Sequence, residues 1–325
     1  MQANILAAFN PAIRAAIFQT LGVRESDLIN LHGFENFVYA LEQHNSILRI
    51  SHSSHRDVDQ LQAELDFLHY LNSAGAQVAA PKPVTGDRFL VNVGEFWLSC
   101  FEIANGQPIT QNDWHQRLFF LWGKEIGRFH RLSKSYQPTK TRRLHWHADA
   151  NFDFLAGIPS DDHEVRQQCI AYRQRLSNQS TDKDQFGLIH GDAHSGNFHF
   201  DSERLCFFDF DDCGYQWFAY DIATILFGAV LMPWIDNTRE AQNQTAISFM
   251  KSFLSGYETE NQLLGLKSNL AFFLKIRELS LYSVIHSHFA SEALMDEYPK
   301  KFMIDRRRRI IADEPFIDVD FEAIL

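Results

Sequence analysis

The sequence predicts an α+β protein in which a small, mainly antiparallel β lobe precedes a large, mainly helical lobe. Its 325 residues exceed the ~100–200 residues of an ordinary domain, so one large domain or two lobes sharing a cleft are expected. Stretches rich in β-branched and aromatic residues dominate the first hundred positions, and helical periodicity dominates from Asn112 onward. We therefore expect lobes at 1–103 and 104–325.

The N-terminal elements follow from periodicity and from turn signals. Asn10 and Pro11 are typical of a helix N-cap and first turn, and Gly22 ends the helix that they begin. Leucines at helical spacing predict a second helix over 55–74, which Gly75 ends. The expected strands are 28–32, 36–41, 46–50, 88–93 and 96–101.

The C-terminal part is expected to be helical around one interruption. Two or three short strands are predicted within 186–208, where apolar runs flank a polar loop. The expected helices are 112–135, 162–176, 217–231, 239–257, 262–290 and 295–311.

Composition narrows the class of protein. Hydrophobic residues make up 45% of the chain, which excludes global disorder, and the net charge of −11 disfavours binding to nucleic acid. The four cysteines form no CxxC pair and are expected to be reduced thiols. The longest uncharged run, 222–235, is shorter than the ~20 residues that span a bilayer. We expect a cytoplasmic protein with no membrane partner, and the oligomeric state stays open.

The most informative motif is the loop HGDAHSGN at 190–197. It presents Asp192 and Asn197 five residues apart, and Asp209 follows at the end of the apolar stretch 205–208. Phosphoryl transfer requires a carboxylate that orients or accepts the hydroxyl proton of the acceptor, together with oxygen ligands for Mg²⁺. A chance acidic turn could explain Asp-x4-Asn alone, but the complete string with a strand-borne aspartate is far more specific.

HGDAHSGN followed by FFDFDDCGYQWFAYDIA resembles the aminoglycoside phosphotransferase and choline kinase-like superfamily. This superfamily includes bacterial homoserine kinase, spore-coat-associated kinases and the bacterial stress-response kinase. The resemblance implies a bilobal protein-kinase-like fold that uses ATP and Mg²⁺. It implies that Asp192 is the catalytic base and that Asn197 and Asp209 are the Mg²⁺ ligands. His190 and Asp221 are implied to be structural, Asp221 by bracing the catalytic loop through backbone hydrogen bonds.

The same resemblance suggests nucleotide-binding residues in the N-terminal lobe. Arg49 in the strand 47–50 stands where protein kinases have a phosphate-binding lysine, and arginine keeps the charge with a different geometry. Glu64 matches the helix glutamate that pairs with this cation. Either residue alone could equally be a surface charge on an amphipathic element.

Two further segments are candidates for nucleotide contacts. The sequence Gly33-Phe34-Glu35-Asn36-Phe37 lies where a phosphate-covering loop is expected, with Gly33 and Asn36 as the candidate residues. The expected hinge ends at Glu102 and Ile103, whose backbone would contact adenine. Backbone contacts do not depend on the side chain, so the sequence leaves ATP and GTP undistinguished.

The chain departs from protein kinases after Asp209. Asp211 replaces the glycine of Asp-Phe-Gly, and only seven residues from Asp211 to Trp217 precede the next expected helix. That length leaves no room for a long phosphorylatable activation segment and favours a small-molecule acceptor.

The acceptor pocket has four candidate residues. Asp211 and Asp212 would suit a cationic amino alcohol or aminosugar, although a helix N-terminal charge is an equal alternative. Arg277 and Tyr282, at near one-turn spacing in the last long helix, either wall this pocket or pack in the core.

We therefore expect transfer of the γ-phosphoryl group of ATP to a hydroxyl of an amino alcohol, an aminoglycoside or a related metabolite. A protein Ser/Thr kinase of the stress-response type is the alternative, and a nucleotide-binding pseudokinase is a weaker one. The complete set of Asp192, Asn197 and Asp209 argues against the pseudokinase. The sequence does not identify the acceptor.

Overall fold

The computed structural model describes residues 3–262, 265–289, 295 and 297–324. The chain divides into two compact units. Unit 1 contains Met1–Gly106, Tyr136–Arg143 and Cys206–Asp211, and unit 2 contains Gln107–Ser135, Leu144–Leu205 and Asp212–Leu325. Unit 1 thus takes in two segments that follow residue 103 in the sequence, and the simple division into 1–103 and 104–325 stays a prediction.

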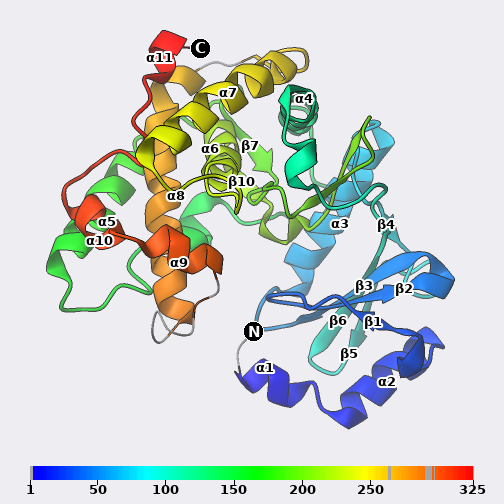
Figure 1. Ribbon diagram of the computed structural model, residues 1–325. Coiled ribbons are helices and arrows are strands. Elements are labelled where there is room, and N and C mark those ends of the chain that lie inside the picture. The colour runs from blue at the N-terminus through cyan, green and yellow to red at the C-terminus, as the bar shows by residue number, and fades with distance from the viewer. Residues whose placement is uncertain (1–2, 263–264, 290–294, 296, 325) are drawn as a thin grey trace. The chain divides into compact units, whose positions relative to one another are not determined.

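Unit 1 is built on a six-stranded antiparallel sheet (Figure 1). The strand order is β1-β2-β3-β6-β4, and β5 also pairs with β6. The strands are β1 (Ile29–Asn30), β2 (Phe37–Leu41), β3 (Ser46–His52), β4 (Pro81–Lys82), β5 (Leu90–Val93) and β6 (Phe96–Glu102).

Helices lie on both faces of this sheet because side chains alternate along β3. Leu48 and Ile50 are fully buried in an apolar cluster with residues of α1 (Ala3–Ala8) and α2 (Pro11–Leu21). Asn10 caps α2 as expected, because its side chain accepts from two backbone amides of the first turn. Arg49 points to the opposite face, toward α3 (Val58–Ser73).

Later parts of the chain join unit 1 through specific contacts. The Tyr136 ring lies 5.0 Å from Phe67 and 5.1 Å from Tyr70, both on α3. The Phe207 amide donates to the carbonyl of Gln77 at 2.9 Å, and the Ala79 amide donates to the Phe207 carbonyl at 2.8 Å. These long-range contacts explain why the segments 136–143 and 206–211 belong to unit 1.

Unit 2 is mainly helical. Helices α4 and α7 pack closely, since a Cβ on Gly123 of α4 would lie 1.8 Å from the Phe253 carbonyl oxygen of α7. Strands β7 (Phe186–Ile189) and β10 (Gly214–Trp217) pair antiparallel, and the loop 190–197 lies between β7 and β8 (Phe198–Phe200). The helices are α4 (Gln116–Ser133), α5 (His163–Leu176), α6 (Phe218–Ala229), α7 (Arg239–Tyr257), α8 (Leu266–His288), α9 (Glu297–Met303), α10 (Arg306–Ile311) and α11 (Phe321–Ile324).

Most expected elements are present with shifted ends, but one prediction is wrong. The segment 295–311 is not a single helix, because Asp305 has a left-handed φ of 53° that interrupts the helical path between α9 and α10. Residues 263–264 and 290 of the expected helix 262–290, and residue 296 of this segment, lie outside the described residues. Four elements were not predicted from the sequence: α1, β4, β10 and α11. No helix in the described part of the chain is both long enough and apolar enough to cross a membrane.

Candidate active site

The loop 190–197 places Asp192 among polar side chains of unit 2. Arg277 Nη2 on α8 donates to Asp192 Oδ1 at 2.8 Å. Asn197 Nδ2 donates to the Asp192 carbonyl at 2.8 Å and lies 3.4 Å from its Oδ2. His194 Nε2 lies 3.3 Å from the same Oδ2. Asp192 and Asn197 are therefore brought together, and Arg277 contacts the proposed base directly.

The electrostatics of this loop keep Asp192 ionised. Burial raises the pKa of the carboxyl, but the charges of His194, Arg277 and His190 and a hydrogen bond from His194 hold the pKa well below its usual range. A carboxylate in this state accepts a hydrogen bond from a hydroxyl and orients it.

A buried network supports the loop from behind. The Gly191 amide donates to Asp221 Oδ1 at 3.1 Å, and Asp221 Oδ2 lies 3.1 Å from His130 Nε2. His130 Nδ1 lies 2.8 Å from the Tyr257 hydroxyl, so the network joins α4, α6 and α7. Asp221 is fully buried, and its contact with the loop backbone has the form that the resemblance implies. His190 is also fully buried, and its Nδ1 accepts from the Asp192 amide at 3.4 Å.

Arg49 and Glu64 form a bidentate ion pair inside unit 1. Arg49 Nη1 and Nη2 donate to the two Glu64 carboxylate oxygens at 2.8 and 2.6 Å, and both side chains are buried. Burial lowers the pKa of Arg49, but Glu64, Asp211 and Asp209 raise it above its ordinary value, so the guanidinium stays charged. The structure thus places a fixed cation on β3 next to the segment that carries Asp209.

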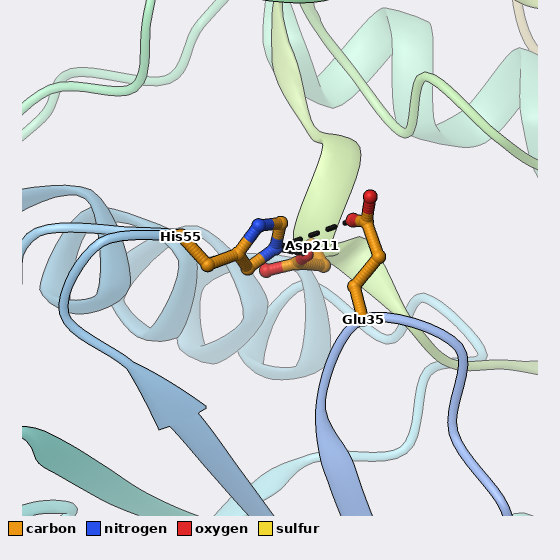
Figure 2. Close-up of side chains that lie close together, drawn as sticks. All are labelled: Glu35, His55 and Asp211. Carbon is orange, nitrogen blue, oxygen red and sulfur yellow. Dashed lines mark hydrogen bonds and ion pairs between the residues drawn. The ribbon is translucent and has the colours of Figure 1, made fainter. Parts of the chain in front are cut away.

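Asp211 lies next to cationic side chains of unit 1, and Figure 2 shows its contact with His55. Its Oδ2 lies 2.5 Å from His55 Nε2, and His55 Nε2 also lies 3.3 Å from Glu35 Oε2. The Asp211 carbonyl accepts from Arg56 Nε at 3.2 Å and from Arg143 Nη2. Asp211 is 6% exposed, and the observed partners of its carboxylate are His55, Arg56 and Arg49, so its role toward an acceptor stays a prediction.

The remaining nucleotide-binding candidates of unit 1 lie in the loop 33–36 and at the end of β6. A Cβ on Gly33 would lie 2.4 Å from the Asn36 carbonyl oxygen, so only glycine fits this tight loop. The Asn36 side chain is buried, and its Oδ1 has no hydrogen-bond partner among the described residues. The Glu102 amide donates to the Ala80 carbonyl at 2.8 Å, and Ile103 is exposed.

The two remaining acceptor candidates lie in unit 2. Asp212 Oδ1 accepts from Asn151 Nδ2 at 3.4 Å. Tyr282 is buried, and its ring lies 4.5 Å from the His286 ring. Arg277, from the same helix as Tyr282, contacts Asp192.

The sequence did not predict the contacts of His194 with Asp192, of Glu35 with His55, or of His55, Arg56 and Arg143 with Asp211. His194 lies inside the recognised loop, two residues after Asp192, so its position was available from the motif. His55, Arg56 and Arg143 have no local signal, because their shared partner Asp211 is 156, 155 and 68 residues away in the chain, respectively.

The loop 190–197 in unit 2 and Asp209 in unit 1 each carry oxygen atoms of the kind that a hard divalent cation takes. Asn197 donates through Nδ2, which leaves its amide oxygen as the acceptor, and Asp209 offers a carboxylate at a residue with a left-handed φ of 62°. Oxygen ligands of this kind are those that Mg²⁺ and Ca²⁺ take in proteins. A third group of potential ligands, Glu35, His55 and Asp211, includes an imidazole.

These features are typical of a phosphotransferase with a kinase-like fold: an antiparallel sheet with a helix packed on it, a helical unit, and an Asp-x4-Asn loop. The family described as "Phosphotransferase enzyme family" matches residues 29–262, so the chain belongs to this family. Amicoumacin kinase from Bacillus subtilis (strain 168) is 31% identical over 301 residues, which cover 90% of this chain and 89% of the relative.

Solved structures agree in fold. A structure of amicoumacin kinase hAmiN in complex with AMP-PNP, Ca²⁺ and Ami has a TM-score of 0.91 and 28% identity and covers 100% of both chains. A microcompartment-associated aminopropanol kinase has a TM-score of 0.71 and 21% identity, and it covers 93% of this chain and 96% of its own. The predicted protein-kinase-like fold is confirmed. The chain is an ATP-dependent kinase that acts on a small-molecule hydroxyl, which was the first of the alternatives drawn from the sequence.

Proposed function

We propose that this kinase phosphorylates a hydroxyl of an amicoumacin-like antibiotic, with Mg²⁺ as the physiological cation. The observation that carries the proposal is the full-length similarity, at a TM-score of 0.91, to an amicoumacin kinase bound to AMP-PNP, Ca²⁺ and Ami. The match to the Bacillus subtilis amicoumacin kinase across 90% of this chain supports the same acceptor class.

In this proposal Asp192 is the general base. Its carboxylate orients the acceptor hydroxyl, whose oxygen forms a bond to the γ-phosphorus while the bond to the bridging oxygen of ADP breaks, and the hydroxyl proton passes to Asp192. Arg277 holds Oδ1 at 2.8 Å, which leaves Oδ2 on the side of His194 and Asn197. We assign Arg277 to the acceptor side of the site because it contacts Asp192 directly, and we assign Tyr282 of the same helix to that side as well.

Other side chains are proposed to bind the nucleotide and the cation. Asn197 and Asp209 would provide oxygen ligands to Mg²⁺, which neutralises charge on the phosphates when it is bound. Arg49, held in its rotamer by Glu64, would contact the phosphates as a fixed cation. Gly33 and Asn36 would form the phosphate-covering loop, and the backbone at Glu102 and Ile103 would contact adenine.

The test is a transfer assay with γ-labelled ATP, Mg²⁺ and amicoumacin, alongside kanamycin, spectinomycin and 1-amino-2-propanol. We expect label on amicoumacin, and we expect Asp192→Asn to bind ATP normally while turnover falls by about 10²–10⁴. Asp201→Asn is the matched control, because Asp201 is an exposed aspartate of unit 2 whose side chain caps its own turn.

Two results would contradict the proposal. Label on another member of the panel, with none on amicoumacin, would remove the acceptor assignment. Turnover retained by Asp192→Asn would remove the base assignment, whatever the acceptor.

A further inference from the structure

Glu35, His55 and Asp211 form a cluster in unit 1 that the proposed function does not explain. One ligand atom from each residue lies within 4.8 Å of the other two (Figure 2). The residues come from three separate segments: the loop before β2, the turn between β3 and α3, and the segment that begins with Cys206.

The central imidazole joins two carboxylates. His55 Nε2 is 2.5 Å from Asp211 Oδ2 and 3.3 Å from Glu35 Oε2. Two carboxylates held this close repel each other unless a positive group lies between them. Burial lowers the pKa of His55, but the hydrogen bond and charge of Asp211, with Glu35, raise it above the ordinary value despite the nearby Arg56.

Asp211 is itself held in place by arginines. Arg56 Nε lies 3.6 Å and Arg49 Nη1 lies 4.0 Å from its Oδ1, and Arg143 donates to its carbonyl. Contacts from His55, Arg56, Arg49 and Arg143 therefore hold Asp211 in place two residues after Asp209.

The other end of the contact is a compact loop. Gly33 allows the chain to turn tightly against Asn36, and Glu35 lies between these two residues with its side chain 39% exposed. A half-exposed carboxylate on a short loop would be mobile in the absence of a partner, since charged surface side chains lose entropy when they are fixed. His55 provides that partner.

We propose that His55 is a positioning residue for nucleotide binding, because it ties Glu35 of the loop 33–36 to Asp211 beside Asp209. The tie holds the proposed phosphate-covering loop and the proposed cation ligand of unit 1 in one arrangement before the nucleotide arrives. This inference rests on the proposed nucleotide-binding role of these segments. The three arginines around Asp211 repel a metal ion at this place, and the 2.5 Å contact with Asp211 Oδ2 is that of an imidazole that donates a hydrogen bond from Nε2.

The experiment measures equilibrium binding of AMP-PNP with Mg²⁺ to the full chain, which requires no acceptor. His55→Leu should weaken binding at least about tenfold, as expected for loss of a charge-assisted hydrogen bond. His55→Gln should stay within about threefold of the unchanged protein, because the glutamine amide offers two donors at similar reach. His69→Leu is the matched control, since His69 is a partly buried histidine of α3 that packs on Phe89.

A double-mutant cycle tests the tie itself. Glu35→Gln should weaken AMP-PNP binding, and adding it to His55→Leu should weaken binding no further. Independent, multiplicative effects would overturn the inference, as would equal binding by His55→Leu and the unchanged protein. Zn²⁺ binding to the unchanged protein that His55→Leu abolishes would also overturn it, in favour of a metal site.

Failure of the inference differs from failure of the proposed function. If the unchanged protein does not bind AMP-PNP, the assigned nucleotide site is wrong as a whole. If it binds AMP-PNP and His55→Leu binds equally well, only the positioning role of His55 is wrong. Equal thermal stability of His55→Leu and His55→Gln would separate positioning from a loss of folding.

Discussion

Replacing Arg49 with methionine removes one partner of a fully enclosed ion pair. Methionine matches the unbranched aliphatic part of arginine but lacks the guanidinium, so it also loses the contact of that group with Phe101, whose ring centroid lies 4.9 Å from the guanidinium carbon. Glu64, which is fully buried, then loses both of its hydrogen bonds from the guanidinium. A buried charge that loses its partner destabilises a protein by about 3–5 kcal/mol.

Replacing Glu64 instead of Arg49 should destabilise the protein less. After Glu64→Gln, the Arg49 guanidinium keeps the nearby charges of Asp211 and Asp209, so it is still partly compensated. Replacing both partners, as in Arg49→Met with Glu64→Leu, removes the buried charges together and should recover much of the stability that the single Arg49 change loses.

Hydrogen exchange measured by mass spectrometry reports this loss of stability at the strand and the helix that carry the ion pair. Because 1.36 kcal/mol corresponds to a factor of ten, peptides from β3 and α3 should exchange about 10²–10⁴ times faster in Arg49→Met. Arg24→Met is the control, because Arg24 is exposed and pairs with Asp27 at the surface, so exchange should not change. Exchange of Arg49→Met within threefold of the unchanged protein, or a double variant as unstable as Arg49→Met, would refute this reasoning.

Two further predictions concern unit 2. Gly123→Ala would place a Cβ 1.8 Å from the Phe253 carbonyl oxygen, so α4 and α7 must separate and stability should fall by about 1–3 kcal/mol or more. An unchanged thermal midpoint would contradict this packing. Burial lowers the pKa of His130 despite the opposing effect of Asp221, so the unfolded chain takes up this proton more readily than the folded one. The contribution of His130 to stability should be complete above about pH 6.5 and decline as the pH falls toward the lowered value of the folded state. Urea unfolding at pH 7.5 and 5.5 measures this decline, which should be smaller in His130→Phe, and equal declines would disprove the assignment.

Local patterns were enough to predict most of the secondary structure. The cap at Asn10, the leucine periodicity of α3 and the alternation in β3 depend on neighbours within a few residues, and these elements formed where expected. The single helix expected over 295–311 failed because the left-handed backbone at Asp305 leaves no clear mark in apolar periodicity. Short pieces such as β4 and β10 were missed since they exist only through pairing with distant strands.

In the candidate site too, local contacts could be predicted from the sequence and long-range contacts could not. Asp192 and Asn197 lie five residues apart in one loop, so the sequence alone places them together, and their hydrogen bond follows from that spacing. Arg277 was recognised only as one polar residue on a helix, and its contact with Asp192 spans 85 residues. A helical pattern cannot state which loop the polar edge of a helix will meet.

The sequence by itself determined the class of enzyme, because the chemistry of phosphoryl transfer requires a few residue types at short, fixed spacing. The tertiary structure alone decided the partners of those residues. Asp211 is the clearest example, because no local pattern predicts His55, Arg56 and Arg143, which folding brings next to it from distant segments. A buried carboxylate must be compensated by whichever cations the fold brings near, and that choice depends on packing between distant segments.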